Sequence, residues 1–176
     1  MRWLWLDRIV ELIPRQRLVA IKHVSLAEEH LHDHFASELS PPGGSEPLPP
    51  MPVMPACFIV EGTAQAAGIL IGHAEGFREK VILAKVSKAE LDLDAVPGDT
   101  LRYTATIQQM DAVGAAASGL VEILSAHDPA RPPQTLARID LVFSHLDNNL
   151  AGESFPEENF VFGESFRTLL RTSGVA

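Results

Sequence analysis

Two patterns of hydrophobic residues divide this chain. Short stretches that are rich in β-branched residues, or in which hydrophobic and polar positions alternate, are typical of β-strands. Two such stretches, residues 3–12 and 18–24, precede the middle of the chain. Four more follow it, at residues 80–88, 101–110, 115–124 and 135–144. In the stretch 101–110, one predicted face carries Leu101, Tyr103, Ala105 and Ile107.

The second pattern is one nearly continuous apolar run, MPVMPACFIVEGTAQAAGILIG, at residues 51–72. We expect a helix that begins at Pro55, because proline is well tolerated in the first turn, and that ends near Gly72 or His73. The helix is apolar on almost every side, so it should be buried. Its small residues let other backbones approach closely, as when a sheet wraps around a helix; they are Gly62, Ala64, Ala66, Ala67 and Gly68.

Two strands, one long buried helix and four further strands predict an α+β fold with an antiparallel sheet. Ser25 is a candidate N-cap for a short helical turn over residues 25–32, with Glu28 at the capping-box position. The Pro-, Gly- and Ser-rich residues 36–50 and residues 126–133 are predicted loops. We expect one domain over residues 1–147, with a Pro-rich insertion at 36–51, and a C-terminal extension over 148–176. Residues 159–171 are weakly amphipathic, which fits a surface helix or a contact with a partner.

Composition narrows the possible partners. The chain has 176 residues, a formal net charge of −9 and no cluster of Lys and Arg, which argues against nucleic acid and anionic membranes as partners. The basic residues that could dock an acidic carrier protein are better explained as a solvated strand edge; they are Arg78, Lys80, Lys85 and Lys88.

The location expected from the sequence is the cytoplasm. A single cysteine, Cys57, allows no intrachain disulfide, which fits a reducing compartment. Residues 1–12 are too short and too charged for the apolar part of a signal peptide. The apolar run at 51–72 makes a poor membrane span, because prolines break its start and Glu61 and Gln65 lie in its middle.

Glu61 is the only charged residue in that apolar run, and burying a charge is costly without compensation. His34 lies upstream in HLHDHF, and a histidine with a buried carboxylate can form a general acid–base site. Alternatively, His34 is structural, and Glu61 is satisfied by a backbone group or by Gln65, which lies one turn later on the same face. Cys57 is a small core residue or, less simply, a nucleophile.

A metal site is the weaker reading of the histidines in HLHDHF. His30, His32 and His34 alternate along the chain. No carboxylate–histidine set with ligand spacing follows them, so we expect no metal.

Four segments occur in an order that resembles the β-hydroxyacyl-acyl carrier protein dehydratases of fatty acid synthesis. They are LDRIVEL, VAIKHVSLAEEHLHDHF, PVMPACFIVEGTAQAAGIL and VPGDTL, and they span most of residues 6–125. Three features differ from the family pattern. The family's Gly-His-Phe-Pro is Asp33 to Ala36 here, an insertion follows the histidine, and Ala56 replaces the glycine after Met-Pro. The chain from about His145 has no counterpart in this resemblance.

The resemblance implies a hotdog fold, in which an antiparallel sheet wraps around a long central helix, and the loss of water from a 3-hydroxyacyl thioester. It assigns His34 as the base and Glu61 as the acid that protonates the departing hydroxyl. The implied substrate-binding residues are Val53, Ala56, Cys57 and Gln65. The backbone carbonyl of Val53 would hold the His34 ring, and the N–H of Ala56 would bind the thioester oxygen.

The family also implies a homodimer in which the histidine and the acid come from different subunits, with the acyl chain in an apolar tunnel at the interface. It implies no metal or organic cofactor, and a substrate carried on acyl carrier protein or coenzyme A. Two other functions stay open for a hotdog fold: hydrolysis of acyl thioesters, and non-catalytic acyl binding.

Overall fold

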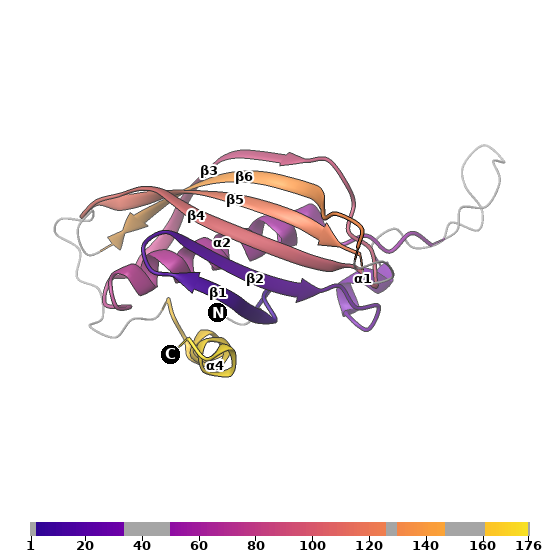
Figure 1. Ribbon diagram of the computed structural model, residues 1–176, viewed down its shortest axis with the longest axis horizontal. Helices are drawn as coiled ribbons and strands as arrows, with labels where there is room; N and C mark the ends of the chain where they lie inside the picture. The colour runs from indigo at the N-terminus through magenta and orange to yellow at the C-terminus, as the bar shows by residue number, and fades with distance from the viewer. Residues whose placement is uncertain (1–2, 34–49, 126–129, 147–160, 176) are drawn as a thin grey trace.

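The computed structural model describes residues 3–33, 50–125, 130–146 and 161–175. A six-stranded antiparallel sheet with the order β1-β2-β4-β5-β6-β3 forms the main layer (Figure 1). Its strands are β1 (Arg8–Ile13), β2 (Arg17–His23), β3 (Val81–Leu91), β4 (Thr100–Met110), β5 (Gly114–Leu124) and β6 (Gln134–His145). The helices are α1 (Glu29–Asp33), α2 (Ala56–Ala74) and α4 (Glu164–Ser173). The α+β arrangement expected from the sequence is confirmed.

Helix α2 forms the core together with one face of the sheet. It contacts β2 to β6, and most of its residues from Ile59 to Gly72 are buried. By length and composition α2 is the one helix among the described residues that could cross a membrane, and 61% of its most apolar window is buried inside the fold. We therefore interpret α2 as a core helix.

The small residues of α2 allow the close approach that the sequence predicts. A methyl group added at Gly62 would lie 2.9 Å from Cζ of Tyr103, which is fully buried on β4. The predicted inward face of β4 is confirmed, because Leu101, Tyr103 and Ala105 are all buried. Ile107 packs against the core from a partly buried position.

The chain before β1 differs from the expected strand at residues 3–12. β1 begins only at Arg8, because the backbone of Trp3 and Trp5 is bound by the Gln65 side chain rather than by a neighbouring strand.

The first helix also begins later than expected. Ser25 does form a turn with Glu28: its N–H donates to Glu28 Oε2 at 3.2 Å, and its Oγ accepts from the N–H of Ala27. Helix α1 itself begins at Glu29. At α2, Pro55 is the N-cap, and the helix begins at Ala56, one residue after the predicted start.

Helix α4 packs against the β1 edge of the sheet. Its apolar residues Phe166, Leu169 and Leu170 are buried, as the spacing i, i+3, i+4 requires. It lies beside β1 (Figure 1), where Ser173 Oγ accepts a hydrogen bond of 2.9 Å from the N–H of Ile9. The amphipathic tail therefore packs on its own chain.

Strand β3 is the opposite edge and is mostly exposed. Lys85 and Lys88 are exposed there, as expected for a solvated strand edge. Lys80 is not, since only 5% of its surface is accessible. That part of the prediction is wrong, because the chain enters β3 under the backbone of Leu146, whose N–H donates to the carbonyl of Lys80 at 3.0 Å.

Candidate active site

The start of α2 brings three of the predicted site residues together. Val53 is buried just before the helix, and the N–H of Met54 donates to the carbonyl of Ala95 at 2.8 Å, which ties this segment to the chain before β4. Ala56 and Cys57 occupy the first helical turn and are exposed. Interpreting Cys57 as a small core residue is therefore wrong for this chain, because the buried part of α2 begins only at Ile59. The first N–H groups of a helix lack intrahelical partners and carry partial positive charge, so Ala56 can present such a donor.

Glu61 and Gln65 form a fixed pair further along α2. The Gln65 amide nitrogen Nε2 donates to Glu61 Oε1 at 2.9 Å and to the carbonyl of Trp3 at 3.0 Å. Its oxygen Oε1 accepts from the N–H of Trp5 at 2.8 Å. The Trp5 donor fixes which end of the amide is oxygen, so the nitrogen must face Glu61. Gln65 is buried and Glu61 is half-buried, so a rigid amide orients a carboxylate that still reaches solvent-accessible space.

An apolar pocket adjoins Glu61. Its volume is about 150 Å³. Its walls come from four elements and from the two residues 161 and 162 before α4: Glu61, Ala64, Gln65, Gly68 and Ile69 on α2, Val81, Ile82 and Leu83 on β3, Phe143 on β6, Phe166 on α4, and Val161 and Phe162. Such a pocket can bury the hydrocarbon part of a ligand. A carboxylate at its rim can then exchange a proton with a polar group of the same ligand.

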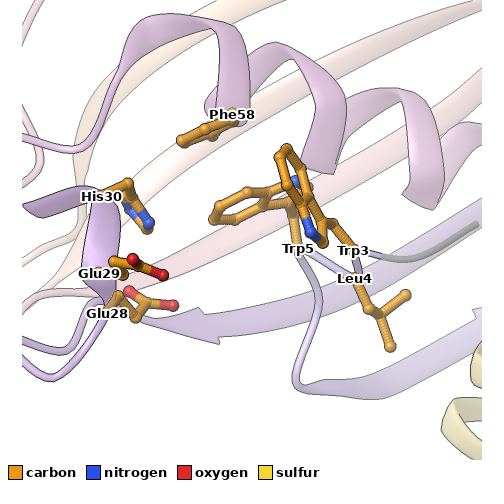
Figure 2. Close-up of a pocket in the computed structure, with 7 residues that line it drawn as sticks. All are labelled: Trp3, Leu4, Trp5, Glu28, Glu29, His30 and Phe58. Atoms are coloured by element: carbon orange, nitrogen blue, oxygen red, sulfur yellow. The ribbon is translucent and has the colours of Figure 1, made fainter.

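An aromatic cluster joins the N-terminal segment to α1 and α2 (Figure 2). The rings of Trp5 and Phe58 stack with centroids 4.0 Å apart. The His30 ring meets both edge-on, at 5.2 Å from Trp5 and 4.9 Å from Phe58. The cluster lines a cavity of about 560 Å³ together with Trp3, Leu4, Glu28 and Glu29. Since α1 ends at Asp33, the cluster fixes the segment that leads directly to residue 34.

A buried lysine holds the same segment from the other side. Lys22 is 5% exposed, and its Nζ donates to Glu28 Oε1 at 2.6 Å and to the carbonyl of His23 at 2.7 Å. Asp7 Oδ1 lies 3.6 Å away. The sequence analysis missed this cluster, although a lysine inside the apolar strand sequence LVAIKHV is a visible signal that the charge has partners.

Tyr103 is a second buried polar group near α2. Burial, and then the charges of Asp7 and Glu28, raise the pKa of its hydroxyl, which therefore stays protonated at neutral pH. Among the described residues this hydroxyl has no hydrogen-bond partner. Because its ring lies against Gly62, Tyr103 sets the depth at which α2, and with it Glu61, sits in the sheet.

Of the predicted pair, His34 lies outside the described residues, so the structure does not place it. The chain emerges toward it from α1, and the part of the chain after the insertion returns at residue 50. In the described ranges, no group of three or more His, Cys, Asp or Glu side chains could hold a metal ion. His30 instead packs against Trp5 and Phe58.

The fold is the hotdog fold, in which an antiparallel sheet wraps around a central helix. Solved structures similar to this chain include the dehydratase heterocomplex ApeI:P from Xenorhabdus doucetiae, with a TM-score of 0.56 and 15% identity over 81% of this chain and 82% of that chain. An acyl-CoA hydrolase from Staphylococcus aureus in complex with coenzyme A has a TM-score of 0.56 and 15% identity over 96% and 92% of the two chains. At these identities the likeness shows the fold alone, and it confirms the predicted hotdog arrangement.

Sequence similarity identifies the family among proteins of this fold. Residues 47–125 match the FabA-like domain. The chain is 34% identical over 123 residues to the 3-hydroxyacyl-[acyl-carrier-protein] dehydratase FabZ of Solibacter usitatus, which covers 69% of this chain and 67% of that protein. It is 34% identical to the FabZ of Lactobacillus helveticus over 63% of this chain and 68% of that protein. The chain therefore belongs to the FabZ family of 3-hydroxyacyl-[acyl-carrier-protein] dehydratases.

The match does not extend over whole proteins. The chain spans 56% of the FabZ of Koribacter versatilis, at 37% identity, and 63% of that of Alkalilimnicola ehrlichii, at 33% identity. The family expected from the sequence is confirmed, and with it the dehydratase class.

Replacing Gln65 with Leu should both destabilise the fold and weaken the site. The substitution keeps the size of the side chain but leaves the N–H of Trp5 and one oxygen of Glu61 without their partner. An unsatisfied buried donor costs about 1–3 kcal/mol, so we expect a loss of that order in the free energy of unfolding, measured by urea denaturation. Gln65→Glu is the companion variant: it keeps the acceptor for Trp5 but places two carboxylates side by side, so it should be at least as harmful. Unchanged stability in both variants would contradict the role of Gln65 as the anchor of this segment.

Proposed function

We propose that this protein removes water from a 3-hydroxyacyl thioester carried on acyl carrier protein and forms the trans-2-enoyl thioester. One observation carries the proposal: Glu61 is oriented by Gln65 at the rim of an apolar pocket that opens along α2. Family membership supports the same reaction, since the relatives are named as dehydratases of acyl-carrier-protein substrates. If Glu61 had only a structural role, it would not need an apolar pocket beside it.

The elimination assigns one role to each residue. The imidazole of His34 takes the proton from C2, and the electrons of that C–H bond form the C2=C3 double bond as the C3–O bond breaks. Glu61 gives its proton to the departing oxygen, so the leaving group is water. The Ala56 N–H, at the positive end of α2, stabilises the negative charge on the thioester oxygen in the transition state. Val53 would fix the His34 ring through its backbone carbonyl, and Cys57 would lie beside the bound thioester.

The active protein is a homodimer in this proposal. By family resemblance, His34 of one copy works with Glu61 of the other. The exposed edge strand β3 supports this, because Ile82 and Leu83 on that edge also line the pocket beside Glu61. A second copy seated on β3 would therefore complete the wall of the pocket. Acyl carrier protein is the expected substrate carrier, with coenzyme A as the alternative, and the cytoplasm is the expected location.

The proposal is tested by following both possible products from the same reaction. The purified protein is mixed with a 3-hydroxybutyryl thioester of acyl carrier protein or of coenzyme A. The conjugated enoyl thioester is followed by its ultraviolet absorbance, and free thiol by a colorimetric reagent. We expect enoyl product without thiol release, and a loss of about 10²–10⁴-fold in His34→Ala, because a general base contributes that much. Thiol release without enoyl product would instead assign hydrolysis, and binding without either product would assign an acyl-binding module.

A further inference from the structure

The pocket beside Glu61 ends against the C-terminal part of the chain. Positions 61, 65, 68 and 72 lie on one stripe of α2, since they are spaced by whole turns of the helix. Glu61 is at one end of this stripe. At the other end, a methyl group added to Gly72 would lie only 2.4 Å from Cζ of Phe162, so the Phe162 ring rests directly on the backbone of α2. The distance between the two ends is about three helical turns.

Phe162 and Phe166 form a tightly packed wall at the end of the pocket. They are 5% and 3% exposed. The Phe162 ring meets Phe77 edge-on at 5.0 Å and Phe166 at 5.9 Å. Helix α4, which carries Phe166, is fixed to β1 by the hydrogen bond from Ile9 to Ser173. Moving either ring would therefore disturb packing on α2, β1 and α4 at once.

We propose that Phe162 and Phe166 close the acyl pocket and restrict this enzyme to short 3-hydroxyacyl chains. This inference rests on the proposed dehydratase function. The pocket is apolar and continuous with Glu61, so its occupant is the hydrocarbon end of the acyl chain that Glu61 acts on. An apolar cavity of about 150 Å³ takes up a molecule of the size of benzene, or about six carbons, which are C4 to about C9 of an acyl chain whose C3 lies at Glu61. Longer chains would have to displace the two phenylalanine rings.

The middle of the pocket offers an independent way to change its length. A methyl group at Gly68 would lie 3.7 Å from Phe143 Cε1, an ordinary van der Waals contact, so Gly68→Ala fits without strain. In a helix interior this change also removes the conformational cost of glycine. Gly68→Ala therefore shortens the pocket without threatening the fold, whereas substitutions at Phe166 lengthen it.

The test measures kcat/KM for 3-hydroxyacyl thioesters of four, six, eight, ten and twelve carbons. The wild-type enzyme should act on the chains of four, six and eight carbons and lose at least about tenfold by ten carbons, because each misfitted methylene in an apolar pocket costs about tenfold or more. Phe166→Ala should raise kcat/KM for ten carbons at least about tenfold relative to that for four carbons. Gly68→Ala should lower kcat/KM for six and eight carbons relative to that for four carbons.

Leu169→Ala is the matched control. Leu169 is also 3% exposed on α4 but does not line the pocket, so this variant loosens α4 without lengthening the cavity. It should keep the wild-type chain-length profile. If Leu169→Ala shifts the profile as Phe166→Ala does, or if wild type accepts twelve carbons as well as four, the pocket assignment is overturned. If the Phe166 variant does not fold, Gly68→Ala decides alone. A wild-type enzyme that dehydrates no chain length at all overturns the proposed function instead.

Discussion

Replacing Glu61 with Gln should abolish dehydration while leaving the fold intact. Glutamine keeps the shape of the side chain and still offers an oxygen to the Gln65 Nε2 donor, which lies 2.9 Å from Glu61 Oε1. It cannot release a proton to the departing hydroxyl. General acid catalysis contributes about 10²–10⁴-fold, so we expect kcat to fall by about a thousandfold, measured as the rate of enoyl thioester formation at saturating substrate.

The control for that variant is Glu75→Gln. Glu75 is the C-cap residue of the same helix, about four helical turns from Glu61, and forms a surface ion pair of 3.3 Å with Arg15. Glu75→Gln changes the net charge by the same amount as Glu61→Gln. An exposed ion pair contributes at most about 1 kcal/mol to the free energy of unfolding. The free energy of unfolding of both variants should lie within about 1 kcal/mol of the wild-type value, and only Glu61→Gln should lose activity. More than a tenth of wild-type kcat in Glu61→Gln would remove Glu61 from the proposed mechanism.

Local patterns were enough to predict the elements that carry the site. The apolar run around Glu61 predicts α2 to within two residues at each end. A helix that is buried on nearly every side is apolar along its whole length, so the length of the run alone gives its bounds. The spacing of four residues places Glu61 and Gln65 on one face, and their hydrogen bond confirms it. Strands are predicted equally well, because the alternation of residues along a strand identifies its inward face. On β4 this face carries Leu101, Tyr103 and Ala105, which are all buried.

The contacts that orient the site came from parts of the chain that no local pattern connects. Gln65 binds the backbone of Trp3 and Trp5, which is about 60 positions away and carries no periodic signal for that contact. Phe162 contacts Gly72 across an even longer separation along the chain. The amphipathic spacing of α4 predicts a helix with one buried face but not the surface on which that face lies. Such contacts depend on tertiary packing, which sequence spacing does not encode.

The proposed function also requires assembly into a homodimer, and one substitution on β3 should prevent that assembly. β3 is an edge strand with Leu83, Val86 and Leu91 exposed by 39%, 39% and 37%. Soluble proteins normally protect an exposed hydrophobic edge by charge or by covering it, and here a second copy can do so. Val86 is the middle residue of β3, so in a two-fold antiparallel pair it lies close to its counterpart.

Val86→Lys should therefore split the dimer and inactivate the enzyme together. It adds a third lysine beside Lys85 and Lys88, and like charges opposed across an interface cost several kcal/mol. We expect the dissociation constant to rise at least about a hundredfold, as measured by sedimentation velocity. As the protein is diluted, specific activity should fall in proportion to the dimer fraction, because in the proposed dimer each site takes His34 from one copy and Glu61 from the other.

Val10→Lys separates an effect of the interface from an effect of added charge. Val10 is 53% exposed on β1, the opposite edge of the sheet, so the same substitution there should leave both the dimer and the activity unchanged. A wild-type protein that is fully active as a monomer would refute shared sites outright. A Val86→Lys protein that stays dimeric would move the interface away from β3. A Val86→Lys monomer that keeps its full activity would show that one chain supplies both the base and the acid, which the position of Glu61 beside the β3 edge argues against.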